Sequence, residues 1–158
     1  MRVRLAQRGV PENDRDARAG QVMATFGSLG VHTDIAGGME AVRAQGVRLV
    51  TLCHGSASVA EGLLNRAGLA DSVDMLLSVE DASAWKPHPS SYGYALASCE
   101  VAAGDAMLVA VHPWDIDGAA RAGLRIGWLN RRGARFPAYF DAAEVEAVDL
   151  VELTRRWR

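Results

Sequence analysis

Three polar groups in this sequence have the types and spacing to do chemistry together: a thiol or hydroxyl, an ammonium and a carboxylate. Lys86 is the single lysine among 17 basic residues. It lies in the segment WKPHP (85–89), where two prolines restrict the backbone. Cys53 and Asp115 each come shortly after an apolar run. Because an ammonium is a compact point charge that the arginine fork does not replace, the set could hold an anionic substrate and position a reactive carboxylate.

Each of these groups also has an ordinary structural explanation. Lys86 would then be a solvated surface lysine, and Cys53 a small buried hydrophobe. Ser56 and Asp115 would cap the helices that follow them. Loop or packing roles would account for the remaining candidates, which are His54, His112 and Trp114.

The elements that must position these groups are predicted to be alternating strands and helices. Apolar runs predict strands at 47–52, 75–79, 106–111 and 125–129, with a weaker candidate at 145–150. Helical spacing and glycine or proline punctuation predict helices at 36–45, 56–67, 90–100 and 116–122. Runs this apolar suit strands buried on both faces of a parallel sheet. We therefore expect an α/β fold with a Rossmann-like parallel sheet and helices on both faces.

The first part of the chain differs from the rest. Residues 2–8 and 16–29 predict two helices around a turn at 9–13, with no apolar strand before them. We expect this segment to be a helical appendage on the α/β core. In open parallel sheets, ligands bind beyond the carboxyl ends of the strands, so the three polar groups are expected to converge on one rim. Gly55, at a predicted helix start, adds backbone N–H groups that suit an anion.

Composition limits the classes of function. A chain of 158 residues suits one domain with a sizeable core. The net charge of −2 provides no basic field for nucleic acid, and no apolar run is long enough to span a bilayer. The N-terminus lacks the apolar core of a secretory signal, and Cys53 and Cys99 provide neither metal spacing nor a disulfide framework. We expect a cytoplasmic protein without nucleic-acid or membrane partners.

Three segments, in this order, resemble motifs of the haloacid dehalogenase superfamily, most closely its haloacid dehalogenase-like, type II branch. LVTLCHGS (49–56) resembles the second motif, AWKPHPSSY (84–92) the third, and LVAVHPWDIDGAARAGLRIGWLNR (108–131) the fourth. The resemblance covers almost the whole chain. It implies a remnant of a helical cap at 1–33 and an α/β core at 34–158.

The resemblance also implies a chemistry. In that family, an aspartate at the end of the first strand attacks the substrate and forms an ester that water hydrolyses. By position, Lys86 would stabilise that carboxylate, and Asp115 would orient the nucleophile or the water. No cofactor and no metal site are implied for the dehalogenase branch. Substrate binding would fall to Cys53, His54, Gly55, Tyr92, His112 and Trp114.

The sequence departs from the family pattern at several points. No strand followed by Asp-x-x-x-Thr occurs before residue 47, so we expect the nucleophile and the first, central strand to be missing. Cys53 and His54 stand where a hydroxyl residue and an asparagine are usual, and His112 replaces a polar amide. Val111 stands where metal-dependent phosphatases carry another carboxylate, so Mg²⁺ is expected only if the chain is a phosphatase.

Three functions therefore remain open. The first is a hydrolase that acts on a small 2-haloacid through an aspartyl ester and is inactive as given, because its nucleophile is absent. The second is an Mg²⁺-dependent phosphatase of the same superfamily. The third is a non-catalytic remnant that serves as a binding or dimerising module. The expected partner is a small anionic substrate, and a homodimer is left open.

Overall fold

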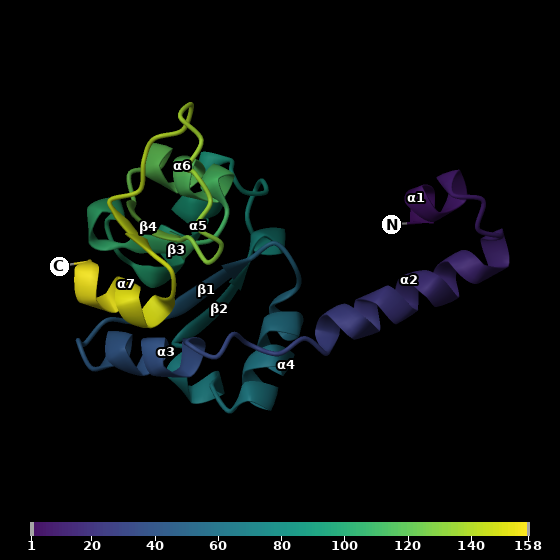
Figure 1. The fold of residues 1–158 in the computed structure, drawn as a ribbon, viewed down its shortest axis with the longest axis horizontal. Coiled ribbons are helices and arrows are strands. Elements are labelled where there is room, and N and C mark those ends of the chain that lie inside the picture. Colours follow the sequence, from purple (N-terminus) through teal and green to yellow (C-terminus); the bar gives the residue numbers. More distant parts are fainter. Residues whose placement is uncertain (1, 158) are drawn as a thin grey trace.

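The computed structural model describes residues 2–157, which form an α/β body from which two helices project (Figure 1). The first half contains α1 (Arg2–Gln7), α2 (Glu12–Gly27), α3 (Ile35–Arg43), β1 (Val50–Cys53), α4 (Ala57–Ala67) and β2 (Met75–Ser78). The second half contains α5 (Pro89–Cys99), β3 (Met107–Ala110), α6 (Pro113–Arg121), β4 (Arg125–Leu129), β5 (Val145–Ala147) and α7 (Leu150–Arg156). Short 3₁₀ turns lie at Ala70–Ser72, Val79–Asp81 and Ala103–Asp105.

The strands form two parallel sheets, and no strand among the described residues joins them. β1 pairs with β2, with Val50 opposite Met75. The other sheet has the order β3-β4-β5, with Met107 opposite Arg125. β1 and β3 each keep one edge without a strand partner in this part of the chain, and every residue in both is only half-buried. The split is compatible with the expected central gap, which stays a prediction.

The predicted parallel α/β fold is confirmed, with differences at the ends of elements. The strand expected at 125–129 has those bounds. Helix α2 begins at Glu12, earlier than expected, because Pro11 directly before it suits a helix start. The segment 145–150 divides into a short strand and a helix that was not predicted. Asp149 begins that helix, since its side chain accepts a hydrogen bond from the Glu152 N–H at 2.7 Å.

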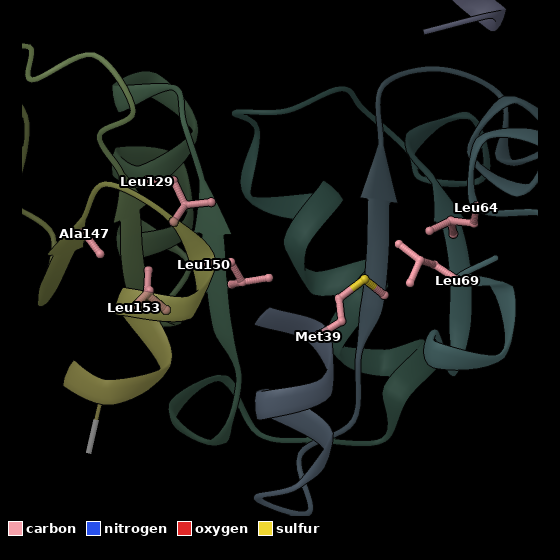
Figure 2. Close-up of a cluster of buried hydrophobic side chains, with 7 residues drawn as sticks. All are labelled: Met39, Leu64, Leu69, Leu129, Ala147, Leu150 and Leu153. Atoms are coloured by element: carbon pink, nitrogen blue, oxygen red, sulfur yellow. The ribbon is translucent and has the colours of Figure 1, made fainter. Parts of the chain in front are cut away.

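One hydrophobic cluster unites the two sheets. Its buried members are Met39, Leu64, Leu69, Leu129, Ala147, Leu150 and Leu153. In Figure 2, the members from α3, α4 and the turn after α4 lie on one side, and those from β4, β5 and α7 on the other. Helices α3 and α7 approach closely at Gly38, where a Cβ atom would lie 2.5 Å from Leu150 Cγ. Side chains of α3, α4 and α7 therefore contribute much of the packing that holds the two sheets together.

The N-terminal helices lie apart from this core. Figure 1 shows α2 leading away from the body, with α1 at its far end. Apolar side chains on α2 remain open, with Val22 50% and Met23 56% exposed. The division of the chain at residue 33 stays a prediction. No helix in the described part of the chain is long and apolar enough to cross a membrane.

Candidate active site

The ammonium and the carboxylate singled out from the sequence meet in a buried ion pair. Lys86 Nζ lies 2.8 Å from Asp115 Oδ2, and the two side chains are only 8% and 6% exposed. Lys86 comes from the loop between β2 and α5, and Asp115 from the first turn of α6. Because removing two charges from water costs several kcal/mol per ion, a pair this buried marks a candidate functional site.

Tyr92 holds the same carboxylate from the other side. Its hydroxyl donates to Asp115 Oδ1 at 2.7 Å, and the ring is fully buried in α5. Burial, together with the hydrogen bond to Asp115, raises the pKa of Tyr92 well above its usual range. The phenol therefore stays protonated and keeps donating. Both oxygens of Asp115 are engaged, one by an ammonium and one by a phenol, which fixes the orientation of the carboxylate.

Gly118 allows helix α6 to lie against the Lys86 loop. A Cβ atom at this position would be 2.6 Å from both Pro87 Cβ and the Tyr92 hydroxyl. Sequence reasoning did not identify this requirement. The available signal was the i, i+3 spacing from Asp115, which places the two residues on the same side of a helix. The glycine thus helps to bring the carboxylate within reach of the ammonium.

A cluster of aromatic and imidazole rings surrounds His54. The His54 ring centroid lies 5.3 Å from Trp85 and 5.7 Å from Trp114, in edge-to-face arrangements. His112 contacts the same Trp114 ring at 5.3 Å. Burial and the nearby Lys86 charge lower the pKa of His54. Sequence reasoning did not place Trp85 among the substrate-binding residues, although its position directly before Lys86 was a usable signal.

The other predicted residues lie at the same strand end with different partners. Cys53 ends β1 opposite Ser78 as a half-buried free thiol. The Gly55 carbonyl accepts a hydrogen bond from Ser78 Oγ at 3.1 Å. Ser56 is the N-cap of α4, and its side chain accepts from the Ser58 N–H. Within residues 2–157, the structure gives no side-chain contact from Cys53 to the Lys86–Asp115 pair, so its substrate-binding role stays a prediction.

Comparison with known proteins identifies the family. The model of the haloacid dehalogenase-like hydrolases matches residues 4–123. The chain belongs to this family. Haloacetate dehalogenase H-2 of Moraxella sp. (strain B) is 31% identical over 103 residues, which cover 65% of this chain and 46% of that enzyme. (S)-2-haloacid dehalogenase of Pseudomonas sp. (strain YL) is 26% identical over 138 residues, which cover 87% of this chain and 60% of that enzyme.

Solved structures of haloacid dehalogenase-like proteins have the same fold. An L-2-haloacid dehalogenase matches with a TM-score of 0.86 at 25% identity, over 98% of this chain and 67% of the other. A haloacid dehalogenase superfamily phosphatase from Thermococcus onnurineus matches with a TM-score of 0.70 at 28% identity, over 79% of this chain and 57% of the other. The resemblance drawn from the three motifs is confirmed.

As a haloacid dehalogenase-like hydrolase, this chain is short. It spans about half the length of the curated relatives it matches. Six of the site residues predicted from the family motifs lie close together in the structure: Lys86, Asp115, Tyr92, His54, His112 and Trp114. Their roles in catalysis and substrate binding stay predictions.

Proposed function

We propose that this chain carries the lysine- and aspartate-bearing part of a hydrolase that releases halide from small 2-haloacids through an aspartyl ester. The observation that carries the proposal is the buried contact of 2.8 Å between Lys86 Nζ and Asp115 Oδ2. An ammonium in a poorly solvated site can stabilise a second carboxylate placed beside it. The names of the Moraxella and Pseudomonas relatives support a haloacid as the substrate class.

Each residue of the site has a definite part in this proposal. Lys86 offers positive charge to the attacking carboxylate and to the charge that develops in the reaction. Asp115 keeps the ammonium in place and orients the nucleophile or the attacking water, and Tyr92 fixes Asp115. The rings of His54 and Trp114 line the neighbouring part of the site, where the anionic end of a small substrate would lie.

The attacking carboxylate is the missing component. No Asp-x-x-x-Thr segment occurs in this sequence, so no aspartate of the chain matches the family's nucleophile motif. The open edges of β1 and β3 belong to parallel strands that end just before His54 and Val111. A strand lying between them and parallel to both would end near the Lys86–Asp115 pair. We therefore propose that the 158 residues alone release no halide, and that a strand ending in aspartate completes the site.

Halide release from 2-chloropropionate tests this proposal. One sample is the chain as given, and the other carries, through a flexible N-terminal linker, a strand followed by Asp-x-x-x-Thr. We expect chloride release only from the extended chain, and we expect Lys86→Ala or an Asn-x-x-x-Thr segment to abolish it. Arg43→Ala, which removes an ion pair to Asp74 whose two side chains are 43% and 35% exposed, is the matched control and should leave turnover intact.

Three outcomes would contradict the proposal. Turnover by the chain as given that Lys86→Ala abolishes would show that no added carboxylate is needed. A folded extended chain without turnover would favour a non-catalytic binding module. Mg²⁺-dependent hydrolysis of p-nitrophenyl phosphate by the extended chain would favour the phosphatase alternative, which Val111 disfavours because it adds no carboxylate ligand.

A further inference from the structure

One buried polar atom beside the ion pair has no partner. His54 Nε2 is shielded from solvent and forms no hydrogen bond within the described part of the chain. Leaving a buried donor or acceptor unsatisfied costs about 1–3 kcal/mol. The rings of Trp85 and Trp114 pack on His54 and provide no acceptor for it. Such a group is a ready contact for a ligand, because binding would supply the hydrogen bond that folding leaves unmade.

The charges around His54 favour an anion as that ligand. Lys86 disfavours a proton on the ring, and His112, directly before α6, acts in the same direction. Asp115 favours the proton, but its carboxylate is already bound to Lys86 Nζ and the Tyr92 hydroxyl. Cys53, next in the chain, is a free thiol. A protonated His54 therefore lacks a counter-charge of its own, and an incoming anion would supply one.

The covering side chain can admit a ligand. Trp85 packs on His54 and is 60% exposed, so few contacts hold its ring in place. It belongs to the same loop as Lys86. Trp114 is half-buried in the first turn of α6 and packs on the His54 ring as well. A ligand that displaces this exposed ring would take its place against His54.

We propose that His54 binds the anionic part of the ligand through Nε2 and takes up a proton from solvent as it does so. Anion binding at this site then strengthens as the pH falls. This inference rests on the proposed function for the identity of the ligand, which is a small monovalent anion, either the leaving halide or the substrate carboxylate. Family members usually carry an asparagine at the position of His54. An asparagine can donate a hydrogen bond but cannot take up a proton. The pH dependence is therefore a property of this sequence.

The experiment uses the 158-residue chain with sodium bromide or sodium propionate as the probe. Ionic strength is held constant with sodium sulfate, whose divalent anion lies outside the proposed ligand class. We expect the probe to raise the pKa of the His54 ring. Titration of the imidazole nitrogens by ¹H–¹⁵N NMR spectroscopy measures this pKa. Since one proton is taken up, probe affinity should increase by up to about tenfold per pH unit between about pH 7.5 and pH 5.5. Binding of bromide tests whether His54 contacts the leaving halide, and binding of propionate tests whether it contacts the substrate carboxylate.

Two variants separate His54 from other groups. His54→Asn should bind the probe with an affinity that does not change over this pH range. His88→Asn is the matched control, because His88 is an exposed helix N-cap in the Lys86 loop and asparagine also caps helices. It should keep the full pH dependence. Tryptophan fluorescence, reporting on the rings next to His54, provides a second readout of binding.

Several results would overturn the inference. These are no binding of either probe, no change in the His54 ring pKa, or an unchanged pH dependence in His54→Asn. Because these measurements need no turnover, they are independent of the halide-release assay. If His54 responds to the probes and the extended chain is inactive, only the proposed function fails. If the extended chain is active and its anion binding is independent of pH, only this inference fails.

Discussion

A single carboxylate organises the candidate site at the scale of residues. Asp115 receives an ammonium on one oxygen and a phenol hydroxyl on the other, and all three side chains are buried. An isolated buried charge is very unfavourable, whereas a paired and hydrogen-bonded one is tolerated. The arrangement therefore depends on both partners being present. Removal of either partner should affect folding as well as function.

Replacing Lys86 with methionine tests this dependence directly. The variant leaves Asp115 buried with Tyr92 as its only described side-chain partner, so the free energy of unfolding should fall by about 3 kcal/mol. Urea unfolding at neutral pH measures the change. Arg43→Met is the matched control, because the Arg43–Asp74 pair is 43% and 35% exposed. Its loss should cost less than about 1 kcal/mol.

The double variant Lys86→Met with Asp115→Asn isolates the unpaired charge. Its neutral amide can still accept the Tyr92 hydrogen bond. If the unpaired Asp115 charge destabilises Lys86→Met, the double variant should recover at least half of the lost free energy of unfolding. A double variant as unstable as Lys86→Met alone would indicate that lost packing, rather than the charge, is responsible.

At the scale of elements, the site depends on helix α6 lying against the Lys86 loop. This contact is tight at Gly118, where a Cβ atom would meet Pro87 and the Tyr92 hydroxyl. The loop follows β2 in one sheet, and α6 follows β3 in the other. Residues that follow strands of separate sheets thus meet at a position where only glycine fits without displacement.

Gly118→Ala is expected to destabilise the protein even though alanine favours helices. The added methyl group must push α6 away from Pro87 and Tyr92, at a cost of about 1–3 kcal/mol. Gly93→Ala in α5 is the matched control, because a Cβ atom added at Gly93 would meet nothing within 4 Å. It should be neutral or stabilise by up to about 1 kcal/mol. Urea unfolding of both variants measures the change in the free energy of unfolding. Equal changes at Gly118 and Gly93 would contradict the close approach of α6 to Pro87 and Tyr92.

The order of elements was predictable because apolar runs and glycine or proline punctuation are local signals. The meeting of Lys86 and Asp115 followed from parallel topology, which brings the carboxyl ends of strands to one rim. Helix α7 was missed because its cap, Asp149, lies inside the segment VEAVDL (145–150), which was assigned to a weak strand candidate. Trp85 contacts His54, which follows β1, and Gly118 of α6 lies against the Lys86 loop. Both contacts join segments far apart in the chain, and no spacing within one segment encodes them.

At the scale of the whole molecule, a polar network at Asp34 adds to the contacts between the two halves of the α/β body. Asp34, at the start of α3, accepts two hydrogen bonds from Arg131 at 2.8 and 2.9 Å and one from the Leu150 N–H at 2.8 Å. Burial alone would raise the pKa of Asp34, but the hydrogen bonds from Arg131 and Leu150 outweigh it and lower the pKa. The network connects α3, the loop after β4 and the first turn of α7.

The network predicts a specific pH dependence of stability. A carboxyl group whose pKa is lower in the folded state contributes stability above its unfolded pKa of about 3.9, and loses it as the pH falls through its folded pKa. Asp34→Asn should therefore cost about 3 kcal/mol at pH 6, and the difference from the unsubstituted chain should shrink toward about pH 3. Urea unfolding at both pH values measures it. Asp71→Asn, at an exposed position, should have little effect at either pH.

The open edges of β1 and β3 lead to the last prediction. Unpaired strand edges present free N–H and C=O groups that pair readily with other chains. We expect the 158-residue chain to associate with itself as its concentration rises, as seen by sedimentation velocity. Met23→Glu, on the exposed apolar side of α2, should leave this association in place, because it does not alter the sheet edges.

The extended chain used for halide release provides a second way to tell whether the chain associates through its sheet edges or through α2. If its added strand lies between β1 and β3, both edges are paired and the protein should sediment as a monomer. Loss of association in Met23→Glu would instead place the contact on α2. A chain that stays monomeric at every concentration would show that the edges are protected despite their exposure. Association that the added strand suppresses, together with turnover that it restores, would place the missing carboxylate and the missing strand at one position in the molecule.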